Sequence, residues 1–241
     1  MAPRVISLSA TKGGFACGTS VAIKKIFYKN NKETDFFDYL LTSMKSINEI
    51  LCGKPIKFDN YCYNSHIISF SNFHHLHSIH DLDKYNKYLG KEKKSVVPLS
   101  ILNELTNKYK RRFERLINSI KNEKKIYFVR YCIDNNDIRF EAVEDFFKII
   151  KNINSELECK FILVTKEPNL FVKHELLENK NFYLLNLRKY NKNDELENLK
   201  DFPVNDELFE KQVKSMEPLY NFINNIENIE NIENIENIEN I

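Results

Sequence analysis

Between residues 100 and 190 the apolar spacing alternates between that of helices and that of strands, which constrains the fold more than any other feature of the sequence. The elements predicted in order are a helix at 100–122, a strand at 125–131, a helix at 140–157, a strand at 159–165, a short helix at 171–178 and a strand at 181–187. The apolar run within Lys125–Tyr131 predicts a strand buried on both faces. We therefore expect an α/β fold, a three-layer, mostly parallel sheet with helices on both faces, similar to a Rossmann fold.

The start of the chain adds a further strand and helix to this pattern. Arg4–Ser9 is a short β-rich run, a loop follows at 10–19, and residues 20–27 have helical spacing. Thr19 or Ser20 is the N-cap expected for this helix, because a hydroxyl at that position can accept from a free backbone N–H group.

The rest of the chain completes one predicted domain. A second helix is expected from Thr42 or Ser43, as the N-cap, to about Leu51, and residues 56–80 alternate enough to hold short strands. A last helix is expected over 206–216. We predict a single α/β domain over residues 1–220.

The C-terminal segment, residues 221–241, is of low complexity. From Asn225 the triplet Ile-Glu-Asn repeats to Ile241, and a period of three matches neither the 3.6 residues of a helical turn nor the 2 of a strand. The isoleucines would precess around a helix, so a disordered or frayed-helical tail is expected. A helix that binds a partner is the alternative.

Composition narrows the class of protein. The 241 residues carry 36 basic and 34 acidic side chains, a net charge of +2, which gives no strong field for nucleic acid. No run approaches the ~18 apolar residues of a membrane span, and the first residues lack the apolar core of a signal peptide. We therefore expect a cytoplasmic protein.

The five cysteines are odd in number, widely scattered, and form no C-x-x-C pair. This pattern argues against a disulfide framework and against a cysteine zinc site, so we expect reduced thiols, most of them buried, with neither metal nor cofactor. The cysteines are Cys17, Cys52, Cys62, Cys132 and Cys159.

The loop after the first strand is the first place to look for a ligand, since ligands of parallel α/β sheets lie beyond the carboxyl ends of the strands. Gly13 and Gly18 have the spacing of a phosphate-binding loop, but Thr19 stands where the essential lysine would be, which argues against nucleotide hydrolysis. A weaker anion site formed by backbone N–H groups near Gly14, Gly18 and Thr19 stays open.

Cys17 lies in this loop at or just before a helix N-terminus, where the helix dipole would lower the pKa of a thiol. It is a candidate nucleophile, and a small buried cysteine is the alternative.

Five of the six histidines fall within residues 66–80, where His75 and His77 would share one face of a strand. One of them, paired with a carboxylate such as Asp81, could serve as a base. A surface or structural role and a metal site are the alternatives.

A basic cluster lies in the longest predicted helix. Arg111 and Arg115 are spaced i, i+4 and share a face with Lys108 close by, so they could hold a phosphate or a carboxylate. A solvated face on which these arginines pair with Glu114 is the alternative.

Taken in order, several blocks resemble the papain-like cysteine peptidase family known from large DNA viruses and bacteria. The matching blocks are Val5–Ser9, Gly14–Cys17, Thr34–Ser43, Ser78–Asp81, Tyr109–Leu116 and Lys125–Arg130. The resemblance implies Cys17 as nucleophile, His80 as general base, and Asp81 or Asp38 as the acid that orients the base. If the chain is viral, its compartment would be the host cytoplasm.

This chain departs from papains in two respects. The order and spacing of papain residues would favour His174 over His80 as the base, and papains pair a helical domain with an antiparallel barrel, whereas residues 100–190 here have βαβ periodicity. The periodicity therefore sets our fold prediction.

Three hypotheses for function follow. In the first, the chain is a cysteine-dependent hydrolase of an unidentified protein or small-molecule substrate, with backbone N–H groups near Gly18 and Thr19 stabilising the oxyanion. The second is a glycan- or nucleotide-sugar-processing transferase of Rossmann-like fold that uses the glycine loop with Arg111 and Arg115. The third is a non-catalytic interaction module.

Overall fold

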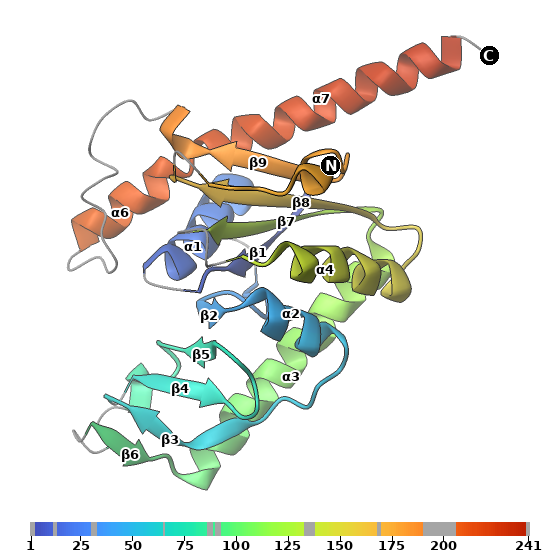
Figure 1. The fold of residues 1–241 in the computed structure, drawn as a ribbon. Coiled ribbons are helices and arrows are strands. Elements are labelled where there is room, and N and C mark those ends of the chain that lie inside the picture. The colour runs from blue at the N-terminus through green and yellow to red at the C-terminus, as the bar shows by residue number, and fades with distance from the viewer. Residues whose placement is uncertain are drawn as a thin grey trace.

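A computed structural model describes residues 3–11, 14–29, 33–64, 66–85, 89, 93–132, 138–167, 170–189 and 206–239 (Figure 1). It contains a four-stranded parallel sheet in the order β1-β7-β8-β9 and a five-stranded antiparallel sheet in the order β2-β5-β4-β3-β6. The parallel strands are β1 (Arg4–Ser9), β7 (Lys125–Cys132), β8 (Glu158–Thr165) and β9 (Phe182–Asn186).

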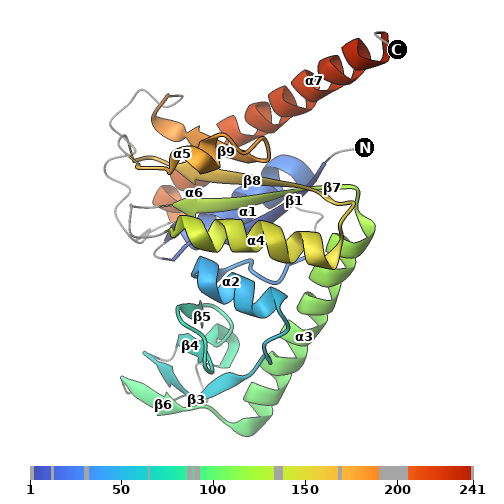
Figure 2. The ribbon, with the colours of Figure 1, turned by 45° about the vertical axis from the view of Figure 1, so that its right-hand side comes forward.

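Helices cover both faces of the parallel sheet, as predicted (Figures 1 and 2). The strands β7 and β8 are buried along almost their whole length, which confirms the burial expected from the apolar run of β7. One face packs against α1 (Gly14–Tyr28), α6 (Asp206–Ser215) and α7 (Pro218–Glu239), and the other against α4 (Phe140–Ile153) and α3 (Leu99–Asn122). Three short helices lie between these elements: α5 (His174–Leu177), η1 (Asp83–Tyr85) and η2 (Leu187–Lys189).

The antiparallel sheet was not predicted as a sheet, although short strands were expected in its region. Its strands are β2 (Leu40–Thr42), β3 (Phe58–Tyr63), β4 (Ile67–Phe70), β5 (Leu76–Ser78) and β6 (Lys94–Val96). The prediction of one mostly parallel sheet therefore holds only for the four-stranded sheet. Short strands are paired by contacts far apart in the chain, and local periodicity does not record those contacts.

The antiparallel sheet has a buried face and an open face. Phe58, Ile68, Phe70 and Leu76 point into the same core as α2 (Met44–Leu51), α3 and α4. The open face continues from the face of the parallel sheet that α1 covers, because Leu41 of β2 packs in the cluster of α1 and forms a parallel bridge with Ala10 at the end of β1.

Two helix starts can be compared with the sequence. Helix α2 is capped by Ser43, whose Oγ accepts from the backbone N–H of Ser46 at 3.2 Å, one of the two caps predicted. Helix α1 begins at Gly14 instead of near Ser20, so Thr19 and Ser20 are buried within the helix and neither is its N-cap. The expected cap was wrong because residues 14–19, which were assigned to the loop and contain two glycines, form the first turns of the helix.

The first triplets of the C-terminal repeat are helical and pack on the sheet as part of α7. Leu219, Ile223 and Ile226 are buried against the sheet, with helical spacings of four and three. Ile229, the next isoleucine of the repeat, is 57% exposed, which is the precession that a period of three produces. The part of α7 before the repeat therefore anchors its first triplets. No helix within the described ranges is long and apolar enough to span a membrane.

Candidate functional site

The candidate site lies where β1 ends and α1 begins, at the edge where parallel α/β sheets bind ligands. Cys17 is the fourth residue of α1 and is only 7% exposed. Burial raises the pKa of its thiol to about 12, so the thiol is protonated at neutral pH. The lowered pKa expected from the helix dipole was therefore wrong for the unliganded protein, because burial outweighs the dipole.

The helix start also changes which backbone groups could stabilise an oxyanion. In a helix that begins at Gly14, the N–H groups of residues 14–17 have no acceptor four residues back, whereas those of Gly18 and Thr19 face the carbonyls of residues 14 and 15. Of the three residues predicted to supply backbone donors, Gly14 lies in the first turn of α1, whereas Gly18 and Thr19 lie further into the helix. Thr19 is also buried.

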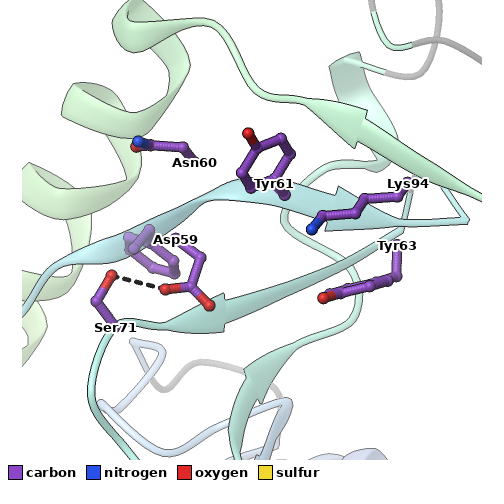
Figure 3. A pocket seen from close by; sticks show the side chains of 7 residues that line it. Asp59, Asn60, Tyr61, Tyr63, Ser71 and Lys94 are labelled. Atoms are coloured by element: carbon purple, nitrogen blue, oxygen red, sulfur yellow. Dashed lines mark hydrogen bonds between the residues drawn. The ribbon is translucent and has the colours of Figure 1, made fainter.

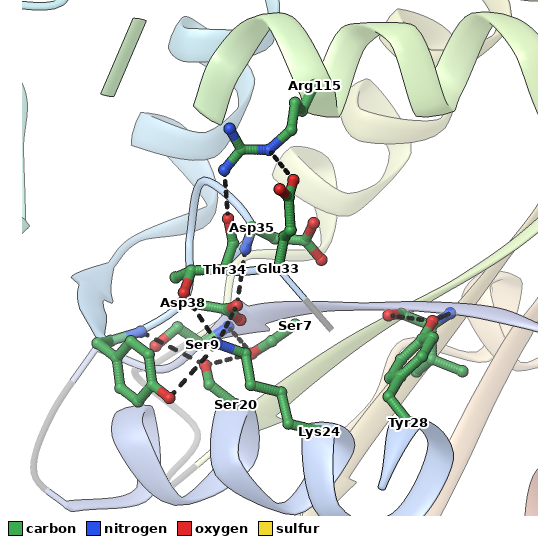
Figure 4. Close-up of polar contacts among 12 residues, drawn as sticks. Ser7, Ser9, Ser20, Lys24, Tyr28, Glu33, Thr34, Asp35, Asp38 and Arg115 are labelled. Carbon is green, nitrogen blue, oxygen red and sulfur yellow. Dashed lines mark hydrogen bonds and ion pairs between the residues drawn. The ribbon is translucent and has the colours of Figure 1, made fainter. Parts of the chain in front are cut away.

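A chain of hydroxyl groups fixes α1 onto β1 and onto the segment before β2 (Figure 4). Ser20 Oγ lies 3.1 Å from Ser7 Oγ and accepts from the backbone N–H of Tyr39 at 3.4 Å. At the far end of α1, Tyr28 Oη accepts from the backbone N–H of Val5 at 2.8 Å. These contacts make α1 antiparallel to β1 and set its position along the strand.

Asp38, one of the two acids proposed to orient a base, takes part in the same anchoring (Figure 4). Its Oδ2 lies 3.3 Å from the Nζ of Lys24 and accepts from the backbone N–H of Asp35 at 2.8 Å. Lys24 also donates to the hydroxyl of Thr34 at 3.1 Å. Asp38 is 1% exposed, and these contacts hold α1 against the segment before β2.

Arg130 of β7 joins the two sheets beneath the site. Its guanidinium donates to the carbonyl of Thr42 at 2.9 Å, to Thr42 Oγ1 at 3.1 Å and to the carbonyl of Leu8 at 3.3 Å. The residue is fully buried. Our sequence reasoning assigned it no role, although a single arginine within an apolar strand is a signal of a buried, hydrogen-bonded charge.

His80 is exposed and lies beside a different acid from the one expected. Its Nδ1 is 3.3 Å from Asp83 Oδ2, and the Nδ1 of His66 is 2.8 Å from Asp83 Oδ1. The structure therefore places Asp83, and not Asp81, next to the imidazole of His80.

Asp81 forms a separate cluster with two residues of α3 and with Ser78 of β5. Its Oδ2 accepts from Ser78 Oγ and from Tyr109 Oη, both at 2.6 Å, and its Oδ1 pairs with Lys108. Burial works to raise the pKa of the carboxyl, but Lys108 and the two hydroxyl donors hold that pKa below its usual value. Asp81 is therefore a charged anchor between β5 and α3.

His77 of β5 lies on the open face of the antiparallel sheet. It pairs directly with Leu41 of β2 and with Ser69 of β4, and Ser69 Oγ is 2.9 Å from its Nδ1. Burial lowers the pKa of His77, and of the smaller contributions the charges of His75 and His74 lower it further while that of Asp59 raises it. The ring is therefore neutral at physiological pH and held at one nitrogen, as a proton acceptor needs to be.

The remaining predicted residues are spread over other parts of the molecule. Arg115 donates to the carbonyl of Thr34 at 2.9 Å and lies 3.1 Å from the carboxylate of Glu33, whereas Arg111 is exposed. The guanidinium of Arg115 therefore secures the segment before β2. His174 is exposed on α5 and lies 3.2 Å from Glu178.

The open face of the antiparallel sheet also carries a shallow pocket of about 350 Å³ (Figure 3). Ser71 Oγ donates to Asp59 Oδ1 at 2.8 Å within it, and the Nζ of Lys94 lies 4.2 Å from the ring centroid of Tyr61. The lining residues are Phe58, Asp59, Asn60, Tyr61, Tyr63, Ser71 and Lys94. Within the described part of the chain, no group of three or more His, Cys, Asp or Glu side chains is placed to hold a metal ion.

Comparison with known proteins gives one match. Residues 4–169, more than half of the chain, match the model of a family described as putative papain-like cysteine peptidase, and the chain belongs to this family. The matched range runs from β1 past the end of β8 and includes Cys17 and all five histidines of residues 66–80. Searches of curated proteins and of solved structures found no match.

Proposed function

Starting from this family membership, we propose that the chain is a cysteine-dependent peptidase whose nucleophile is Cys17. One observation carries the choice of cysteine: Cys17 lies at the start of α1, at the ligand-binding edge of the parallel sheet. Of the other cysteines, Cys62, Cys132 and Cys159 lie within strands and Cys52 caps the end of α2. All five are free thiols.

The proposed reaction starts from a neutral thiol, in keeping with the raised pKa of Cys17. Its sulfur bonds to the carbonyl carbon of the peptide while the proton passes to an imidazole nitrogen. The C–N bond then breaks, and the leaving amine takes the proton from the imidazolium. Water next attacks the thioester, which releases the carboxylic acid and restores the thiol.

Two features of the fold support this sequence of steps. The backbone N–H groups of the first turn of α1, beginning with Gly14, are the donors available for the oxyanion. His77 lies on β5, the strand next to β2, and β2 is bridged to the end of β1. His80 with Asp81 is the pair expected from the sequence for proton transfer, although Asp83 is the acid beside His80.

The test is hydrolysis of fluorescein-labelled casein by the purified full-length chain and by two variants. Cys17→Ala should abolish hydrolysis, and Cys159→Ala, which also removes a buried thiol, should retain it. Thermal unfolding of each variant checks that both are folded. Hydrolysis that survives in Cys17→Ala would contradict the proposal. So would a wild-type chain that neither cleaves casein nor alkylates at Cys17 faster than at Cys159.

A further inference from the structure

The position of Cys17 along the sheet follows from the contacts of α1. Tyr28 of α1 lies beside Val5, and Ser20 lies beside Ser7. The start of α1 therefore lies over the end of β1. Cys17 is three residues before Ser20, about 4.5 Å further along this axis at 1.5 Å per residue. This displacement, a little more than one strand residue, brings Cys17 to the last residues of β1, next to Ala10 and its bridge with Leu41.

His77 lies at the same level and on the same face. It is the residue directly opposite Leu41 in the β2–β5 pair, and side chains of directly opposed residues project from the same face of a sheet. Leu41 packs in the cluster that contains α1, so this face is the one that α1 covers. The backbones of β1 and β5 are two strand spacings apart, about 10 Å, with Leu41 between them.

His80 lies at another level. β5 runs antiparallel to β2, with Leu76 opposite Thr42 and Ser78 opposite Leu40. His80 follows Ser78 in the direction that leads away from the end of β1. It lies beyond the end of β5, in the bend that leads to η1, whereas His77 is the central residue of the strand.

We infer that His77 is the base that takes the proton of Cys17, and that Ser69 is a positioning residue that fixes the ring of His77. Ser69 Oγ engages Nδ1 at 2.9 Å, which restrains the ring and leaves Nε2 as the nitrogen that would accept the proton. The inference rests on the proposed function, because it requires Cys17 to be the nucleophile.

The test follows the alkylation of Cys17 by iodoacetamide in the native full-length chain, with each cysteine quantified by peptide mass spectrometry. General base catalysis contributes roughly 10²- to 10⁴-fold to such proton transfers. His77→Gln should therefore slow alkylation of Cys17 at least tenfold at pH 7.5. The exposed Cys52 reports reagent activity, and the buried Cys159 reports global opening in the same sample.

Matched variants separate His77 from its neighbours. His66→Gln removes an exposed imidazole that also lies beside Asp83, and should leave the alkylation rate of Cys17 within twofold of wild type. A larger effect of His80→Gln than of His77→Gln would overturn the inference and leave the proposed function intact. Equal rates in all three variants and the wild type would overturn it as well. Wild-type Cys17 that reacts no faster than Cys159 would overturn the proposed function itself.

Ser69 has its own readout. Ser69→Ala should slow Cys17 alkylation about three- to tenfold, and Ser69→Thr, which keeps the hydroxyl, should restore the rate. If Thr fails to restore a rate that Ala lowers, the side chain acts through packing and the positioning role is wrong. If Ala leaves the rate unchanged, the hydrogen bond has no part in proton transfer.

Discussion

Glu230 of α7 is the carboxylate that ties the C-terminal helix to the parallel sheet. It lies 2.8 Å from the Nζ of Lys125 and 2.5 Å from the Nζ of Lys160, and the side chain of Lys160 is 5% exposed. Glu230→Gln keeps the shape and an acceptor oxygen but removes the charge opposite these two ammonium groups. A hydrogen bond to a charged group contributes about 1.5–3 kcal/mol.

The expected loss of stability is about 2 kcal/mol, since Lys160 retains Glu158 at 2.9 Å as a partner. For a chain of this size, 1 kcal/mol corresponds to roughly 2–4 °C in Tm, so Glu230→Gln should lower Tm by about 4–8 °C. Differential scanning calorimetry at pH 7 measures the change, and urea unfolding gives the free energy.

Glu227→Gln is the matched control on the next turn of α7. Glu227 Oε1 accepts from Tyr127 Oη at 2.6 Å, a bond that an amide oxygen can also accept, and lies 3.3 Å from the Nζ of Lys125, which retains Glu158 and Glu230 as partners. The expected loss is below about 1 kcal/mol. A Tm for Glu230→Gln within 1 °C of wild type, or a larger loss for Glu227→Gln, would refute the reasoning.

The contribution of Glu230 to stability should depend on pH in a defined direction. Burial works to raise the pKa of Glu230, but the hydrogen bonds and charges of Lys125 and Lys160 lower it below 4.5. A carboxyl whose pKa is lowered by folding contributes stability above its unfolded pKa, and this contribution is lost as the pH falls through the folded pKa. The difference between wild type and Glu230→Gln should therefore shrink below about pH 4.5.

Three further predictions concern the frame of the site. Arg130→Met should lower the free energy of unfolding by about 2–4 kcal/mol, because the Thr42 carbonyl loses a buried donor, and an unchanged urea midpoint would contradict this. Asp81→Asn should flatten the loss of stability below about pH 4, since the pKa of this carboxyl is lowered in the folded chain; the measurement is Tm against pH, and an acid limb as steep as wild type would exclude Asp81 as its source. Removal of residues 231–241 should change Tm by less than about 2 °C, because Ile226 is buried and Ile229 is already exposed; a fall as large as that of Glu230→Gln would show that the later triplets also stabilise the fold.

The amino-acid pattern alone was enough to predict the α/β class, the order of helices and strands after residue 100, and the family. Long periodic segments such as 99–122 and the apolar run of β7 specify their own structure, because amphipathic spacing and two-sided burial are local properties. The N-cap Ser43 was predictable for the same reason. The family match over residues 4–169 agrees with the ordered blocks, none of which needs three-dimensional information to be noticed.

The tertiary structure decided how the candidate residues are grouped. Asp81 follows His80 directly in the sequence, yet turns toward α3, whereas Asp83 lies beside that imidazole. His80 and Asp81 lie in the bend and turn between β5 and η1, where the backbone changes direction, so chain neighbours need not be partners. The pairing of β2 with β5 placed His77 opposite Leu41, whose neighbour across the bridge is Ala10 at the end of β1.

Burial and distant pairing account for the other differences. The position of Cys17 at a helix start predicts a lowered thiol pKa, but its pKa depends on how much water the folded chain removes around it, which no local pattern records. Likewise, the period-three repeat lacks a continuous apolar stripe, yet α7 is held by Leu219, Ile223 and two glutamates that meet lysines of β7 and β8. Local periodicity thus determined which segments are helices and strands, whereas long-range strand pairing and desolvation determined which side chains can react together.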